Sequence, residues 1–204
     1  MGKQRPIPSV LTEAQANAIL AVPNPDSHTG LRLRTIMATM LYGGLRVSEV
    51  CHLTPADIHL ASDRRMIEVR DSKRGGCRNV PIDLRLLPWL ERWGRERPSE
   101  GKAFFAMRWG QGITEPNRTL VWKVVKNAAR EAARLHPELG IEPETVKCHT
   151  LRHTAASDFY EASRDIMLTG ALLGHKSPLT TAIYVHTKAS AVREVMDRMA
   201  TATQ

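Results

Sequence analysis

The chain has 204 residues, 42% of them hydrophobic, and a formal net charge of +8. This length suits one domain or two small ones, and the apolar fraction is enough for a core. The charge favours a polyanionic partner, either nucleic acid or an acidic membrane surface. No apolar run could span a bilayer and no signal peptide opens the sequence, so we expect a cytoplasmic protein with no membrane partner.

The first quarter of the chain is expected to form three helices after a basic lead-in, residues 1–11. Thr12 and Gln15 form a capping-box pattern, which opens a helix that ends near residue 22. Apolar residues at helical spacing predict a second helix over about 30–42. Two glycines then interrupt the pattern, and a third helix is expected over about 46–54.

The periodicity changes in the next segment, which predicts three short antiparallel strands over 58–60, 66–70 and 77–82. The second hairpin has a basic tip. Basic residues at hairpin tips commonly act as solubility devices that block edge-to-edge pairing. The functional alternative is a finger that reaches into a groove of DNA, with contacts from Arg70, Arg74 and Arg78.

Helices are expected to dominate the rest of the chain. Asp83 should cap a helix that ends before Pro98, and a longer helix should run over about 117–135. The longer helix has a packed apolar face and a separate basic face. A basic face is usually only solvated, but on a basic protein one that tracks phosphates is equally plausible. The residues of this face are Lys123, Lys126, Arg130 and Arg134.

The last third of the chain is predicted to hold four more helices. Two of them span about 149–162 and 165–173, and a short one after residue 177 carries Tyr184. A final amphipathic helix from about residue 187 either packs on its own core or docks onto a neighbouring subunit. Its apolar stripe consists of Val192, Val195, Met196 and Met199.

His149, Arg152 and His153 recur at i, i+3 and i+4, so they share one face of a helix. Three donors on one rigid face suit an oxygen-rich anion such as a phosphodiester. A surface helix with solvated polar groups would show the same pattern. A zinc site that uses Cys148 or His175 is a further alternative. The zinc alternative is disfavoured, because Arg152 would place a fixed cation among the ligands.

Four motifs occur in order along the chain: Gly43-Gly44-Leu45-Arg46-Val47-Ser48-Glu49, His149-x-x-Arg152-His153, Leu173-Gly174-His175 and Tyr184-x-His186. Together they resemble the catalytic domain of the tyrosine recombinases, the phage integrase family. The resemblance covers roughly residues 10–195. Each motif alone is weak, but the order and the spacing of all four are specific.

The resemblance implies an α+β fold that is mainly α-helical with a small three-stranded antiparallel sheet. This tyrosine recombinase catalytic-domain fold, also called the DNA breaking-rejoining fold, should occupy residues 12–199, followed by a flexible tail over 200–204. Family members usually carry a separate amino-terminal core-binding domain. Because the catalytic-type region starts almost at once, we expect that domain to be absent.

The resemblance also implies a catalytic set of six residues. Two arginines would clamp the phosphate oxygens, a tyrosine would attack phosphorus, and two histidines and a hairpin lysine would handle protons and hydrogen bonds. Glu49 and His153 would support the site. Guanidinium groups can take the place of Mg²⁺ at the phosphate, so neither a metal nor a cofactor is expected. The six residues are Arg46, Lys73, His149, Arg152, His175 and Tyr184.

The expected function is site-specific DNA recombination or integration, with a covalent 3′-phosphotyrosyl intermediate on Tyr184. Double-stranded DNA would be one partner. Further copies of the chain would be the other, in a tetramer on paired sites with possible exchange of the carboxy-terminal helix. Two rival functions share the fold, namely relaxation of DNA by a type IB topoisomerase and regulation by a non-cutting DNA-binding protein.

Overall fold

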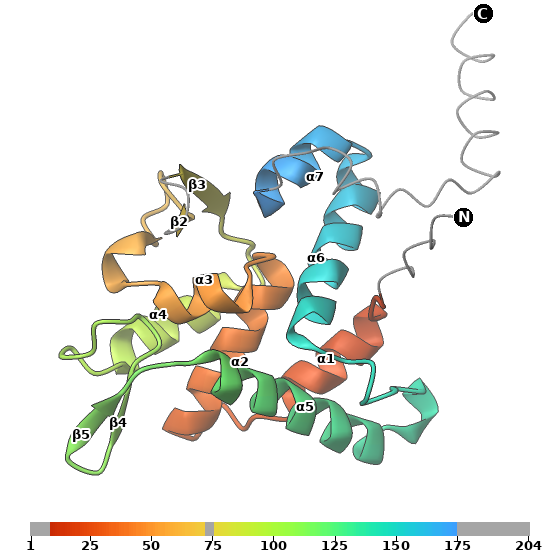
Figure 1. Ribbon diagram of the computed structural model, residues 1–204, viewed down its shortest axis with the longest axis horizontal. Helices are drawn as coiled ribbons and strands as arrows, with labels where there is room; N and C mark the ends of the chain where they lie inside the picture. The colour runs from red at the N-terminus through yellow and green to blue at the C-terminus, as the bar shows by residue number, and fades with distance from the viewer. Residues whose placement is uncertain (1–8, 72–75, 175–204) are drawn as a thin grey trace, which may run out of the picture.

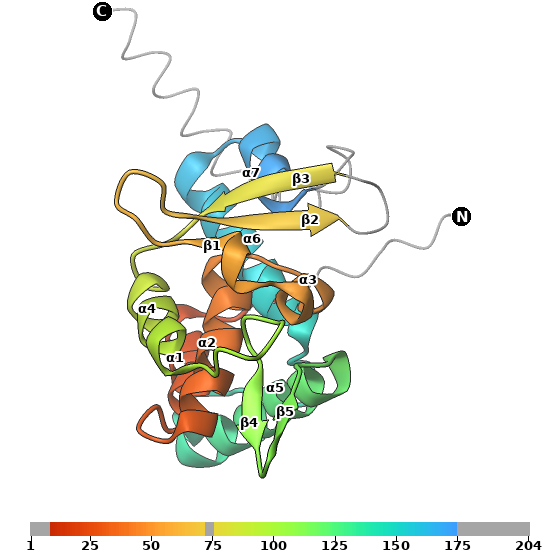
Figure 2. The ribbon, with the colours of Figure 1, turned by 90° about the vertical axis from the view of Figure 1, so that its left-hand side faces the viewer.

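A computed structural model describes residues 9–71 and 76–174 of the chain. Within these residues the fold is α+β and mainly helical, as predicted. A three-stranded antiparallel sheet lies at one end of the helical body, and a two-stranded hairpin lies at the other (Figures 1 and 2). The α-helices are α1 Glu13–Ala21, α2 His28–Tyr42, α3 Val47–His52, α4 Leu87–Glu96, α5 Arg118–Leu135, α6 Cys148–Ser163 and α7 Ile166–Leu173.

The larger sheet has the order β1-β2-β3, and its strands match the three predicted from the sequence. Its register pairs Ile67 with Val80 and Val69 with Arg78. Two 3-10 turns, η1 Pro55–Asp57 and η2 Pro137–Leu139, complete the connections. The strands are β1 Ile58–His59, β2 Met66–Asp71, β3 Gly76–Pro81, β4 Met107–Trp109 and β5 Gly112–Thr114.

Helix α2 is the central element of the core and packs against α1, α4, α5 and α6. Leu31, Ile36 and Met37 on this helix are fully buried. Removing a side chain of this size from water contributes roughly 1.5–3 kcal/mol. Since these helices hold α2 in place, the segment that follows it, residues 43–46, has a fixed position from which to build a site.

Local signals place several helix ends where the sequence predicts them. Thr12 and Gln15 form the predicted capping box at the start of α1. Asp165 accepts hydrogen bonds from two backbone N–H groups at the start of α7, and Gly174 ends that helix with a φ of 65°. These short-range features do not depend on the tertiary fold, so they can be predicted from sequence.

Two sequence expectations for the middle of the chain are wrong. The fourth helix begins at Leu87, because residues 84–86 form a turn over Asp83. Leu84, which directly follows the predicted cap Asp83, is 71% exposed and lies in this turn. The segment between residues 98 and 117, for which no helix or strand was predicted, contains the β4–β5 hairpin. In the described part of the chain, no helix is both long enough and apolar enough to cross a membrane.

Candidate active site

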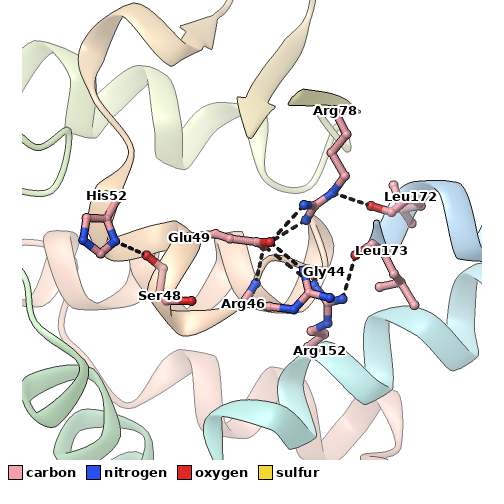
Figure 3. A network of polar contacts seen from close by, with 9 residues as sticks. All are labelled: Gly44, Arg46, Ser48, Glu49, His52, Arg78, Arg152, Leu172 and Leu173. Atoms are coloured by element: carbon pink, nitrogen blue, oxygen red, sulfur yellow. Dashed lines mark hydrogen bonds and ion pairs between the residues drawn. The ribbon is translucent and has the colours of Figure 1, made fainter. Parts of the chain in front are cut away.

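The candidate site is built around the carboxylate of Glu49, in the first turn of α3 (Figure 3). The backbone N–H of Arg46 donates to Oε2 of Glu49 at 2.7 Å, and its guanidinium Nη1 donates to Oε1 at 2.8 Å. A carboxylate at the third position of a helix can reach back in this way to the residue before the helix. The sequence spacing of the two residues therefore dictates their contact.

Arg152 enters the site from α6, with a side chain only 5% exposed. Its Nη1 donates to the carbonyl oxygen of Gly44 and its Nη2 to that of Leu173, both at 2.7 Å. Nη1 also lies 3.7 Å from Oε2 of Glu49. The guanidiniums of Arg46 and Arg152, which are far apart in sequence, therefore meet at one carboxylate.

Gly44 is the backbone position that allows this approach. Its φ is 63°, a region that favours glycine, and a Cβ there would lie 3.1 Å from a methyl carbon of Leu173. The Gly43-Gly44 pair thus ends α2 and also lets α6 and α7 approach the segment that carries Arg46.

Arg78 of β3 also reaches Glu49. Its Nη1 and Nη2 donate to the two carboxylate oxygens at 2.9 and 2.8 Å, and its Nε donates to the carbonyl oxygen of Leu172 at 3.0 Å. From the sequence, Arg78 was expected to contact DNA from the surface of the hairpin. That placement is wrong, because the side chain is 16% exposed and points into the site. Its signal in the sequence was a basic residue in the second predicted hairpin, which does not reveal the direction of the side chain.

The electrostatics of the site favour an ionised Glu49. Burial would raise the pKa of this carboxyl, but hydrogen bonds and charge from Arg78, followed by hydrogen bonds from Arg46, outweigh burial and lower the pKa to about 2. Among the described residues, three guanidiniums and one carboxylate meet here, so the local charge is positive. The Arg46 side chain is 40% exposed and is therefore accessible to an anion from solvent.

His149 and His153 lie one turn apart on α6, with ring centroids 6.3 Å apart. His149 is exposed, whereas His153 is partly buried. Burial, His149 and Arg152 together lower the pKa of His153, so its neutral form is favoured near pH 7. Burial raises the pKa of the Cys148 thiol to about 11, which disfavours the thiolate that a zinc site would need. No group of three potential ligands from His, Cys, Asp and Glu is placed to hold a metal within residues 9–71 and 76–174.

Several candidate residues lie outside the described part of the chain. Lys73 and Arg74 belong to the connection between β2 and β3, and His175 follows Gly174 directly. Tyr184 and the proposed carboxy-terminal helix come later in the sequence. The structure thus brings together Arg46, Glu49 and Arg152, adds Arg78, and leaves the remaining assignments as predictions.

Comparison with known proteins now places the chain in a family. The model of the phage integrase family matches residues 9–191. The chain belongs to the phage integrase family. It is 34% identical over 190 residues to the tyrosine recombinase XerD of Pseudomonas aeruginosa, a match that covers 89% of this chain and 58% of that protein. It is 32% identical to the tyrosine recombinase XerA of Pyrococcus furiosus, over 94% of this chain and 62% of the relative.

Solved structures agree with the family assignment at the level of the fold. The crystal structure of XerA recombinase aligns with a TM-score of 0.74 at 24% identity and covers 96% of this chain and 66% of that chain. The Tn1549 transposon integrase in complex with transposon right end DNA aligns with a TM-score of 0.76 at 21% identity, over 97% and 68% of the two chains. The chain spans somewhat under two thirds of the length of the XerD and XerA recombinases that it matches in sequence.

The basic residues expected to contact DNA in this integrase-family chain differ in their surroundings. Lys123 is exposed, and Arg130 is exposed but paired with Glu144. Arg70 is exposed too and lies 3.0 Å from both Asp57 and Glu68.

Lys126 is the exception on the basic face of α5. Its side chain is buried, and its Nζ donates to the carbonyl oxygens of Pro143 and Glu144 at 2.7 and 2.8 Å. The expectation that Lys126 lies on a solvated face is wrong, because the loop after α5 folds back over it. We therefore do not retain Lys126 as a DNA contact.

A pocket of about 520 Å³ lies between helices α2 and α5 and the segment that follows α1. Val22, Leu33 and Ala128 contribute to its mostly apolar wall. None of the candidate catalytic residues that the structure describes lines this pocket.

Proposed function

We propose that this chain is the catalytic part of a site-specific DNA recombinase that cuts and rejoins DNA through a covalent 3′-phosphotyrosyl link. The observation that carries the proposal is the meeting of Arg46 and Arg152 at Glu49. The match to named tyrosine recombinases over most of the chain supports it. The relatives are named as recombinases, so DNA relaxation and non-cutting regulation are not favoured.

In the proposed reaction, the hydroxyl oxygen of Tyr184 attacks the phosphorus of a phosphodiester. A bond forms between that oxygen and phosphorus, and the bond to the 5′ oxygen breaks. His149 accepts the proton of the tyrosine, and Lys73 gives a proton to the departing 5′ oxygen. One phosphodiester replaces another, so rejoining needs neither ATP nor a metal. The exposed position of His149 at the guanidinium-bearing face of α6 suits a base that meets incoming DNA.

The two clamp arginines would act on the non-bridging oxygens of the same phosphate. Negative charge grows on these oxygens in the transition state, and preorganised guanidiniums stabilise it without moving. The carbonyls of Gly44 and Leu173 fix Arg152, and Glu49 fixes Arg46. His175 would donate a further hydrogen bond to the same phosphate. His153 would support the site from α6.

Double-stranded DNA is the proposed substrate, and exposed basic residues would follow its backbone. Arg70, Arg74, Lys123 and Arg130 are the proposed phosphate contacts. Two paired DNA sites would bring the chains together as a tetramer, with residues 187–199 of one copy docking on the next. A substrate of this kind would place the protein at the nucleoid, in the cytoplasm.

The proposal is tested with nicked suicide duplexes, prepared from the DNA that flanks the gene and from a randomised pool. After incubation in EDTA, denaturing electrophoresis should reveal a protein–DNA adduct, and sequencing of the trapped strand should give the cut site. Tyr184→Phe should form no adduct. An adduct that persists in Tyr184→Phe would place the nucleophile elsewhere, and no adduct with any duplex would contradict the proposed function.

A further inference from the structure

Arg78 occupies a position that the proposed cleavage chemistry does not explain. It is not one of the two clamp arginines, and it does not lie on the outer surface of the hairpin. All three guanidinium nitrogens of Arg78 donate hydrogen bonds. Nη1 and Nη2 donate to Glu49, and Nε donates to the carbonyl oxygen of Leu172. A bidentate pair of this kind fixes both the position and the plane of the carboxylate.

The surroundings of Arg78 are shaped to hold it. Gly174 closes over its side chain, and a Cβ at that position would lie 3.0 Å from Cδ and Nη1 of Arg78. The backbone of Gly174 has a φ of 65°, so a side chain there would also be strained. Arg78 thus joins three elements, because it extends from β3, pairs with Glu49 of α3 and contacts the carboxyl end of α7.

The charge of Arg78 has a consequence for Arg46. A single buried carboxylate attracts whichever cation is nearest, and a guanidinium that it neutralises is less available to a phosphate. Arg78 satisfies both oxygens of Glu49 from the hairpin side. Glu49 can then orient the guanidinium of Arg46 through one side-chain hydrogen bond of 2.8 Å while the Arg46 side chain stays 40% exposed.

Resting on the proposed function, we propose that Arg78 is a positioning residue: it serves as the counter-ion of Glu49, so that Arg46 is oriented for the phosphate without being neutralised. Arg78 itself does not contact the DNA. Without Arg78, the charge of Glu49 would fall on Arg46 and on Arg152, whose Nη1 lies 3.7 Å from Oε2 of Glu49, and would oppose their contact with the substrate. Hydrogen bonds and charge from Arg78 are also the largest influences that keep the pKa of Glu49 low.

The test compares Arg78→Met, Arg78→Lys and the double variant Arg78→Met/Glu49→Gln in single-turnover cleavage of the trapped duplex. At saturating protein, Arg78→Met should slow adduct formation about 30-fold, and its affinity for the same duplex should change less than about threefold. Arg78→Lys keeps the positive charge and should slow adduct formation less than Arg78→Met does. The double variant Arg78→Met/Glu49→Gln should form adduct about tenfold faster than Arg78→Met, because it removes the negative charge that would otherwise neutralise Arg46.

The control is Arg92→Met, which removes a guanidinium paired with Glu96 on α4 and should leave the rate unchanged. A merely structural role for Arg78 predicts the opposite result for the double variant, since a second change at the site would add to the damage. An unchanged rate in Arg78→Met, or a double variant slower than Arg78→Met, would overturn the proposal. If Arg78→Met does not fold, the comparison of Arg78→Lys with Arg78→Lys/Glu49→Gln decides in the same way.

A second readout does not depend on cleavage. In carboxyl-labelled protein, NMR titration should find the Glu49 carboxyl ionised throughout the pH range in which the fold persists. In Arg78→Met the same carboxyl should titrate at a pH higher by about one unit or more. An unshifted titration would overturn the role of Arg78, whereas loss of adduct formation in the unsubstituted protein would overturn only the proposed function.

Discussion

Glu49 makes the stability of the fold depend on acid pH. Its pKa is about 2 in the folded protein and near 4.5 without its partners, so the folded state favours the ionised form. The resulting stabilisation is fully present above pH 4.5 and is lost as the pH falls toward 2. The ionised Glu49 therefore contributes on the order of 3 kcal/mol to the free energy of unfolding above pH 4.5.

The prediction for Glu49 is a change in the slope of stability against pH. Urea unfolding is measured between pH 6 and the lowest pH at which the protein folds. The free energy of unfolding should decrease once the pH is lower than about 4.5. Glu49→Gln should be less stable at pH 6 and should show a flatter slope. Glu131→Gln provides the control, because the side chain of Glu131 is 42% exposed and pairs with the exposed Arg134 on the same helix, α5. Equal slopes for Glu49→Gln and the unsubstituted protein would contradict this account.

Some contacts of single residues were predictable from sequence, and others were not. The contact between Arg46 and Glu49 follows from a spacing of three residues at a helix start, so it could be predicted locally. The partners of Arg78 and Lys126 lie 29 and 17 or more positions away in sequence. Whether a basic side chain faces solvent or a carbonyl depends on which loop packs over it, and no local pattern encodes that.

At the scale of elements, strong periodic patterns were reliable and short ones were not. Helices α1, α5 and α6 begin and end close to the predicted positions, because caps and apolar spacing both mark them. The β4–β5 hairpin has strands of three residues each, too short to show alternation. The start of α4 was misplaced because Asp83 caps a turn that precedes the helix.

The junction of α7 with the hairpin gives an element-scale prediction. Gly174→Ala should destabilise the fold and slow adduct formation, because a Cβ there meets Arg78 at 3.0 Å and the backbone has a positive φ. Gly140→Ala is a matched control, since Gly140 has a φ of 58° but nothing within 4 Å of its would-be Cβ. The control should cost only the backbone strain, roughly 1–2 kcal/mol, and should leave the cleavage rate unchanged.

The outcome for the two glycine variants separates backbone strain from contact. Chemical denaturation gives the stability of each variant, and single-turnover cleavage gives its rate. Gly174→Ala should lose more stability than Gly140→Ala and should share the slow cleavage of Arg78→Met. Equal stability losses with equal cleavage rates would mean that the close approach to Arg78 has no effect on the site.

At the scale of the whole molecule, the candidate active site lies where three separate parts of the fold converge. Helix α3, strand β3 and the junction of α6 with α7 each supply one side of the guanidinium cluster (Figure 3). No single element could hold this cluster, so the site exists only in the folded chain. The chain matches recombinases that are longer than itself. Assembly of several copies on DNA is a separate proposal at this scale.

The last prediction concerns that assembly. Tyr184→Phe protein, which should bind without cutting, is mixed with a duplex carrying two copies of the trapped site or one copy, and the complexes are weighed by mass photometry. The two-site duplex should yield a tetramer, whereas the one-site duplex should yield smaller complexes at low protein concentration. Val195→Asp with Met196→Asp should abolish the tetramer and spare one-site binding, because a charge on an apolar docking stripe costs desolvation.

The control for assembly is Glu194→Gln, which changes the polar side of the same segment and should leave the tetramer intact. Tetramers that survive the two aspartate substitutions would show that residues 187–199 do not join neighbouring copies. If the protein with an unsubstituted stripe gives no tetramer on paired sites, the tetramer itself is contradicted. The two results separate the docking segment from the assembly that it is proposed to build.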